Sequence, residues 1–345
     1  MRAAVYYGQK DVRIEDLETP RAGDHDIVIR NLYASICGTD VAVYMHGPNT
    51  GHRITVGSEF GHEMVSEVVQ VGKNVERIQV GDLVYPYPRL AKGDPRRAGT
   101  VGGFSEYVLI PNAELGQQVY AVPAQIPVRT ACLIEPFTVG CRAARRGMIP
   151  NGDKKYQTGQ SAVVFGCGTI GIAAAVAFQY FGMDKVMICD FSDYRLHLAE
   201  NLGFETCNPG RESFVSHAKT FFGTAPSLTG ETADIDCWLD AAGAESILED
   251  FFRYGKIESR FVSVAVNNVP RKLDLLHMTY AQQSLIGSGG YMPEDVWDVQ
   301  KIMTCGRWNL ETVITREFSL DELETAIRTA ADVDAAGNVV IKMNQ

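Results

Sequence analysis

One segment near the middle of the chain constrains its fold more than any other. Residues 161–165 form an apolar run, and the six residues that follow read Gly-Cys-Gly-Thr-Ile-Gly. An uncharged stretch continues to Met183, and Asp190 closes the next apolar run. A buried strand, a glycine turn, a helix and an acidic residue about 20 positions on are typical of a dinucleotide-binding unit. The pattern predicts a doubly wound parallel sheet here.

The residues of this turn have separate expected roles. Gly166 permits the tight turn, Gly168 lets the backbone approach a pyrophosphate, and Gly171 allows the helix to pack closely on the strand. The phosphates would then lie at the helix N-terminus, at Thr169 and Ile170, where free N–H groups and the helix dipole favour anions. A glycine turn without a ligand is the alternative, and the flanking strand and helix argue against it.

The acidic residue at the end of the next strand predicts the cofactor. Asp190 would accept hydrogen bonds from the adenosine ribose, and it would repel a 2′-phosphate, so NAD is favoured over NADP. Arg195 lies just beyond that strand and could instead bind such a phosphate. Ala242, after the strand expected at 234–241, is a further candidate for cofactor contact.

The 345 residues exceed what one hydrophobic core usually supports, so two domains are expected. The first ~130 residues contain short strands between Gly- and Pro-containing turns, as in a mostly β, partly open barrel. Strands and helices then alternate, and the tail returns to a mixed pattern. We expect an α/β protein with a catalytic domain of residues 1–137 and 288–345. Residues 138–287 would form a Rossmann domain.

Composition limits the partners. A net charge of -10 repels nucleic acid and anionic lipid, so neither is an expected partner. A membrane helix is not expected at 161–183, because three glycines interrupt that stretch. The eight cysteines form no C-x-x-C pair, and the start of the chain reads as a strand rather than a secretory signal. We therefore expect a cytoplasmic protein with free thiols.

Three segments before the nucleotide-binding pattern carry metal-ligand chemistry. The first contains Cys37, the second ends in His62 and Glu63, and the third contains Glu135 before a proline. A thiolate, an imidazole and a carboxylate can hold Zn²⁺ with one position open for a substrate. Taken singly, Cys37 is more often an inert buried thiol and His62 a structural histidine, so spacing alone does not decide between the readings.

Together these segments resemble the zinc-containing medium-chain dehydrogenase/reductase family, the superfamily of alcohol and polyol dehydrogenases. The resemblance runs nearly end to end, through motifs that stand in the family's order: C-G-T-D, G-H-E, V-G-K-N-V, V-G-D-L-V, G-G-F-S-E-Y-V, E-P-F-T-V-G and the glycine-rich turn. It implies a GroES-like catalytic domain beside the Rossmann domain. The Glu135-Pro136 segment resembles the sorbitol and galactitol-phosphate dehydrogenase branch.

The resemblance also implies a site and a reaction. Cys37 and His62 would be fixed ligands of one catalytic zinc, with Glu63 and Glu135 sharing the remaining position. Zinc would act as a Lewis acid on an alcohol, Thr39 would pass the proton on, and NAD would take the hydride. The substrate would be a secondary alcohol or its ketone, of the polyol, sugar or cyclitol class. Members of the family are usually homodimers or homotetramers, and residues 261–266 with the stretch after them could pair across a two-fold axis.

Two departures from the family pattern stand out. Residues 86–102 contain no cysteine, so the four-cysteine lobe that holds a structural zinc is missing. Ala42 replaces a histidine that relays protons in many members, and His46 is a candidate substitute.

Further candidates concern the substrate. Arg89, Lys92, Arg96 and Arg97 could steer an anionic substrate, although a solvated loop is the simpler reading. The aromatic side chains that could line a pocket are those of Tyr44, Tyr291 and Trp297, and a bulkier hydroxylated substrate such as a steroid stays open.

Other functions remain open at this point. A zinc-free NADPH-dependent reductase of quinones or enones would share the fold, and the Cys37, His62 and Glu135 set argues against it. A non-catalytic NAD-binding redox sensor is disfavoured by an intact Thr39. A self-associating scaffold is the third alternative, and no sequence feature requires it.

Overall fold

The computed structural model describes residues 1–48, 50–51, 54–91, 93–94, 97, 100–150, 156–157, 159–267 and 269–343. The chain divides into two compact units. One comprises Met1–Pro136 and Met303–Gln345, and the other comprises Phe137–Ile302.

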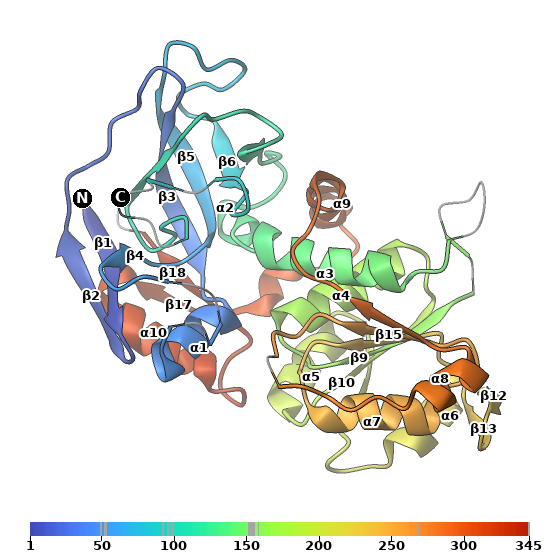
Figure 1. The fold of residues 1–345 in the computed structure, drawn as a ribbon. Coiled ribbons are helices and arrows are strands. Elements are labelled where there is room, and N and C mark those ends of the chain that lie inside the picture. Colours follow the sequence, from blue (N-terminus) through green and yellow to red (C-terminus); the bar gives the residue numbers. More distant parts are fainter. Residues whose placement is uncertain are drawn as a thin grey trace. The chain divides into compact units, whose positions relative to one another are not determined.

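The first unit is mostly β-structure (Figure 1). Its elements are β1 (Arg2–Gly8), β2 (Asp11–Asp16), β3 (Ile27–Ser35), α1 (Gly38–His46), β4 (Ser58–Glu59), β5 (Glu63–Val71), β6 (Leu83–Pro86), β7 (Tyr107–Ile110), β8 (Val119–Ala121), α2 (Val128–Ala131), η1 (Leu310–Val313), β17 (Ile314–Ser319), η2 (Leu320–Glu322), α10 (Leu323–Ala331) and β18 (Asn338–Lys342). A larger sheet has the order β17-β18-β3-β5-β6-β8, with β7 paired to β3, and a smaller sheet has the order β2-β1-β4. The two sheets do not close into one barrel. This agrees with the partly open barrel that the sequence predicted.

The last strand of the chain joins this larger sheet beside β3. Val340 lies opposite Ser35, and Lys342 lies opposite Tyr33. The prediction that the tail rejoins the first domain agrees with this pairing.

The second unit is a doubly wound parallel sheet. Its elements are α3 (Ile134–Gly147, whose first residues belong to the first unit), β9 (Ser161–Phe165), α4 (Thr169–Tyr180), β10 (Lys185–Cys189), α5 (Asp193–Asn201), β11 (Glu205–Cys207), α6 (Phe214–Phe222), β12 (Thr224–Ser227), β13 (Gly230–Ala233), β14 (Cys237–Asp240), α7 (Glu245–Tyr254), β15 (Arg260–Ser263), α8 (Leu275–Ala281), β16 (Ser284–Gly287) and α9 (Pro293–Thr304). Six of these strands pair in parallel in the order β11-β10-β9-β14-β15-β16.

Successive strand residues point to opposite sides of the sheet, so both of its faces are apolar. Helices cover both faces. On one face Val163 and Trp238 pack with Ala218 of α6 and Phe251 of α7. On the other face, α3 approaches the sheet so closely that a Cβ on Gly147 would lie 2.5 Å from the Cys237 sulfur. The strands are consequently buried on both sides, and their sequences are almost continuously apolar.

The structure places residues 288–302 in the second unit, whereas the predicted catalytic domain begins again at residue 288. The physical reason lies in Arg145 of α3. Its guanidinium bonds the carboxylates of Asp295 and Asp298 of α9, each at 2.6 Å, and both acidic side chains are buried. The functional division at 1–137, 138–287 and 288–345 remains our proposal.

Two further expectations concern the chain as a whole. All eight cysteines are free. None of the helices among the described residues is both long and apolar enough to span a bilayer.

Candidate active site

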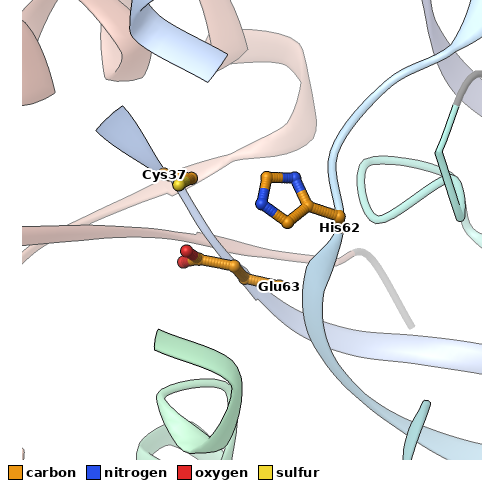
Figure 2. A group of neighbouring side chains, drawn as sticks. All are labelled: Cys37, His62 and Glu63. Carbon is orange, nitrogen blue, oxygen red and sulfur yellow. The ribbon is translucent and has the colours of Figure 1, made fainter. Parts of the chain in front are cut away.

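Two strand ends bring three of the predicted ligands together. β3 and β5 are antiparallel, and Ser35 lies opposite Glu63. Cys37 follows β3 by two residues, and His62 directly precedes Glu63, so all three residues meet at one end of the strand pair. The Cys37 sulfur, an imidazole nitrogen of His62 and a carboxylate oxygen of Glu63 all lie within 4.8 Å of one another. Figure 2 shows these side chains converging.

Burial and charge set the protonation of this group in the absence of an ion. Burial raises the pKa of the Cys37 thiol to about 12, and the neighbouring Glu63 adds to the shift. Burial also raises the pKa of Glu63. Burial opposes a charged His62, but the Asp40 carboxylate outweighs it and holds the pKa of that imidazole well above its usual value. A cation at this point would replace these protons, because metal ligands bind in their deprotonated or neutral forms.

Asp40 connects the two ligands that come from different strands. Cys37 is the N-cap of α1, and the carboxylate of Asp40 accepts a hydrogen bond from the Cys37 backbone N–H at 3.1 Å. The other carboxylate oxygen of Asp40 lies 3.4 Å from Nδ1 of His62. A carboxylate on one ring nitrogen fixes the imidazole and leaves Nε2 to bind a metal. Asp40 is fully buried, so solvent does not compete for these contacts.

The hydroxyl of Thr39 lies beside the predicted metal ligand. Its Oγ1 donates to the Cys37 sulfur at 3.1 Å, and its backbone N–H donates to the same sulfur at 3.5 Å. Two donors stabilise negative charge on sulfur. They also place a hydroxyl next to the predicted ion, where the sequence expects a proton acceptor.

The residues present fit a zinc ion. Sulfur, nitrogen and oxygen donors from three side chains match a catalytic zinc site, which keeps one position open. The Oε2 atom of Glu63 is buried and has no hydrogen-bond partner in the described part of the chain. A buried carboxylate oxygen without a donor is costly, and a cation would satisfy it.

A further hydrogen-bonded chain orients Glu63. The Ser35 hydroxyl beside the Glu63 carboxylate opposes the rise that burial causes in the pKa of Glu63, and the Asn338 amide donates to the Ser35 oxygen at 2.8 Å. Sequence reasoning assigned no role to Asp40, Ser35 or Asn338. The spacing Cys37-x-x-Asp40, which forms a capping box, was the available signal for Asp40.

The fourth predicted ligand stands apart from this group. Glu135 is buried in the first turn of α3, but it does not join the three side chains whose donor atoms lie within 4.8 Å of one another. The carboxylate that the structure brings to Cys37 and His62 is that of Glu63.

The glycine turn has the backbone geometry that the sequence predicts. Gly166 adopts a φ of 99°, a conformation that residues with a Cβ rarely adopt. A Cβ on Gly171 would lie 1.8 Å from the carbonyl oxygen of Gly166, so the helix packs directly on the turn. Gly168 is the N-cap of α4, and Thr169 and Ile170 begin that helix.

The three remaining predicted cofactor residues surround this turn. Asp190 accepts hydrogen bonds from the backbone N–H groups of Cys167, at 2.6 Å, and Ser192, at 2.9 Å. A Cβ on Gly168 would lie 3.9 Å from Nη1 of Arg195, so this guanidinium is next to the turn. Ala242 backs the first glycine, because a Cβ on Gly166 would lie 3.0 Å from the Ala242 nitrogen.

Two residues of the first unit that the sequence suggested for the active site, Tyr44 and His46, do not join the group of Cys37, His62 and Glu63. Tyr44 is fully buried in the core, and its hydroxyl donates to Glu324 at 2.7 Å, so the prediction that it lines a pocket is wrong. His46 is exposed at the last residue of α1. It lies seven residues beyond Thr39, which is about 10 Å along a helix and too far for a direct proton transfer.

The remaining candidates are the two other aromatic residues and the cationic residues of the loop. In the second unit, Tyr291 is buried and Trp297 is half exposed. Arg97 donates to the Glu18 carbonyl at 2.7 Å and pairs with Glu59 at 3.3 Å, so internal contacts occupy it. Lys92 and Arg96 lie outside the described residues.

Comparison with known proteins gives two family matches. Residues 23–124 match the model of the alcohol dehydrogenase GroES-like domain, and residues 166–304 match that of the zinc-binding dehydrogenase. Together the two models match well over half of the chain. The first match lies within the first unit, and nearly all of the second match lies within the second unit.

Individual relatives extend over almost the full length. The (R,R)-butanediol dehydrogenase of Bacillus subtilis (strain 168) is 27% identical, with 94% of each chain covered. An L-threonine 3-dehydrogenase of Anaeromyxobacter dehalogenans is 27% identical and covers 90% of this chain and 89% of its own. The structure of galactitol-1-phosphate dehydrogenase from Escherichia coli has the same fold, with a TM-score of 0.79 at 21% identity over 99% of this chain and 100% of its own.

Proposed function

Because this chain belongs to the zinc-binding alcohol dehydrogenases of the medium-chain family, we propose that it oxidises a secondary alcohol of the polyol, sugar or cyclitol class with NAD. As a family member it is a zinc-dependent oxidoreductase. The observation that carries the proposal is the meeting of Cys37, His62 and Glu63 within 4.8 Å at the end of β3 and β5.

We assign the zinc ligands from this geometry. Cys37 and His62 would be the fixed ligands, and Glu63 would be the third. When bound, zinc supplies Lewis-acid chemistry that lowers the pKa of an alcohol hydroxyl. Asp40 holds His62 and Cys37 in place, and Ser35 orients Glu63.

We propose that Thr39 accepts the alcohol proton and releases its own to solvent. The hydroxyl already lies 3.1 Å from the Cys37 sulfur, so a substrate oxygen near that sulfur would come within hydrogen-bond reach. Ala42 offers no titratable group for a second step, and His46 is too distant. The second step is therefore assigned to water or to the cofactor ribose.

NAD is the proposed hydride acceptor. The two backbone N–H groups that bond Asp190 hold its carboxylate at the end of β10, with lone pairs left for the ribose hydroxyls. The 2′-phosphate of NADP would meet this carboxylate. Arg195 lies beside Gly168, at the turn that would hold the pyrophosphate, and a role there accounts for it without a 2′-phosphate.

The names of the relatives support the substrate class. Butanediol, threonine and galactitol phosphate each carry a hydroxyl on a secondary carbon next to another polar group. The Glu135-Pro136 segment points to the polyol branch. A coupled screen of alcohols would identify the preferred compound within this class.

We also propose that the protein is a homodimer or homotetramer in the cytoplasm. Within the predicted pairing segment, β15 lies between β14 and β16 and has no free edge, whereas the stretch after it contains β16. β16 is the edge strand on that side, and Leu275, Leu276 and Tyr280 of the preceding helix are each at least 66% exposed. Free thiols at all eight cysteines agree with a reducing compartment.

A coupled screen tests the proposed function. Zinc-loaded protein is assayed for NADH formation with a panel of diols, polyols, sugars and cyclitols, with the zinc content measured on the same sample. We expect NAD-dependent turnover of at least one secondary alcohol, lost when zinc is removed and regained when it is restored. Turnover of quinones or enones with NADPH in zinc-free protein would instead support the reductase alternative.

A further inference from the structure

A second group of metal-ligating side chains lies at the edge of the parallel sheet. Cys207 ends the edge strand β11, Glu212 precedes α6, and His217 lies in the first turns of that helix. The Cys207 sulfur, a Glu212 carboxylate oxygen and an imidazole nitrogen of His217 all lie within 4.8 Å of one another. None of these residues belongs to the site described above.

Both ring nitrogens of His217 face carboxylates, an arrangement that is common for histidines that bind metals. Its Nε2 lies 2.7 Å from an oxygen of Glu205, and its Nδ1 lies 2.8 Å from an oxygen of Glu212. When the Nε2–H of His217 donates to the Glu205 carboxylate, Nδ1 carries the free lone pair, and this lone pair points towards Glu212. A carboxylate on the nitrogen opposite the metal fixes the tautomer and raises the basicity of the ligand.

The surroundings combine a protected sulfur with an open side. Cys207 is buried, and it packs with Ala218 and Phe222 of α6. The side chains of His217 and Glu212 are 21% and 45% exposed, so an ion can enter from solvent. Cys189 lies opposite Cys207 in the parallel strand pair.

We propose that Cys207, Glu212 and His217 bind a second zinc ion, with water in the fourth position. One sulfur, one nitrogen and one carboxylate oxygen suit Zn²⁺, whereas Mg²⁺ and Ca²⁺ require oxygen ligands throughout. Glu205 is a positioning residue, because it acts through His217. This ion is separate from the structural zinc of the four-cysteine lobe, and the proposal does not rest on the proposed substrate or cofactor.

The site is connected to the predicted nucleotide site through the backbone. The N–H of Asp190 donates to the carbonyl of Cys207 at 3.2 Å. An ion on the Cys207 side chain would therefore hold the end of β11 against the residue assigned to the ribose. The ion would stabilise the loop between β11 and α6.

Metal content tests the proposal directly. Wild-type protein and variants are stripped with a chelating resin, reloaded with zinc under reducing conditions, desalted and analysed for zinc per chain. We expect two zinc ions in the wild type, one in His217→Gln and two in the matched control His197→Gln, whose histidine pairs with Glu200 on α5. One ion in the wild type, or two in His217→Gln, would overturn the proposal.

Two further sets of variants separate loss of the second site from misfolding and from loss of the first site. Glu212→Gln changes an exposed side chain outside any helix or strand and should also lower the content to one ion, while Glu205→Gln should weaken the zinc affinity about 10- to 100-fold. In a Cys37→Ser background, Co²⁺ should still give sulfur-to-metal absorption, which should vanish in Cys37→Ser/Cys207→Ser. Absence of that absorption in Cys37→Ser would contradict the second site.

Discussion

Asp40 shows how one side chain can organise a site without touching substrate. It closes the capping box of α1 through the Cys37 backbone, and it faces Nδ1 of His62 at 3.4 Å. The start of α1 and the proposed metal ligand His62 therefore depend on the same carboxylate. The C-G-T-D motif predicted that this turn matters, but the contact with His62 depends on a strand register that no local pattern encodes.

At the proposed proton-transfer residue, Thr39→Val should lower kcat about 100-fold or more, because it removes the hydroxyl and keeps the shape of the side chain. The zinc content should stay unchanged, since Thr39 is not a ligand. Steady-state kinetics with metal analysis on the same sample checks both. Thr39→Ser, the matched control, should retain activity within a few-fold, and equal losses in the two variants would argue against a relay role.

At Asp190, the residue proposed to bind the ribose, substitution by Asn should reduce the preference for NAD over NADP at least about tenfold. The substitution removes the charge that repels a 2′-phosphate and weakens charge-assisted bonds to the ribose, and a tenfold change corresponds to about 1.4 kcal/mol. The ratio of kcat/KM for the two cofactors measures this. The exposed Asp184→Asn is the control, and an unchanged ratio in Asp190→Asn would assign the preference to another residue.

At the level of elements, the contact between α4 and the glycine turn is the tightest in the predicted nucleotide site. Gly171→Ala would place a methyl group 1.8 Å from the Gly166 oxygen, so α4 must move away from β9. We expect a loss of at least about 1–3 kcal/mol in the free energy of unfolding and weaker NADH binding. Denaturant unfolding and NADH fluorescence titration measure the two effects.

A control for this variant is Gly289→Ala, where no atom lies within 4 Å of the added Cβ. It should leave both stability and NADH binding nearly unchanged. Equal behaviour of the two alanine variants would contradict the close packing of the turn.

The elements that the sequence predicted are those with a strong local signal. The strand at 161–165 has the predicted bounds because a continuous apolar run marks a strand buried on both faces. Helix α9 begins at Pro293, and proline is favoured at the first position of a helix. Helix α1 was missed, because only nine residues follow Cys37 before Gly47 and its first two, Gly38 and Thr39, are poor helix formers.

The site was predictable in its residue types and less so in its membership. Cys37 and His62 stood out through motifs, whereas the choice between Glu63 and Glu135 depends on how β5 and α3 are placed in space. Glu63 begins β5 directly after His62, so the register of one strand pair brings both residues to Cys37. Cys207, Glu212 and His217 gave no signal at all, because a loop and a helix turn bring them together.

For the whole molecule, the charge and the exposed apolar residues point in different directions. A net charge of -10 favours solubility and keeps copies apart, yet Leu275, Leu276 and Tyr280 leave an apolar face on α8 beside the edge strand β16. A face of this kind on a parallel sheet edge suits a two-fold contact between copies of the chain.

Sedimentation or light scattering at micromolar concentration should therefore give a dimer or tetramer. Leu276→Asp should shift the protein towards the monomer, because it buries a charge in the contact. Val80→Asp, at an exposed position of the first unit, is the control and should not change the mass. A monomeric wild-type protein would contradict the proposed dimer or tetramer.

The central claim is that Cys37, His62 and Glu63 hold the catalytic zinc. Anomalous diffraction at the zinc absorption edge from crystals of the zinc-loaded protein tests it most directly. We expect an ion about 2.3 Å from the Cys37 sulfur and about 2.0–2.1 Å from Nε2 of His62. Absence of an anomalous peak between these two side chains in fully active protein would contradict it.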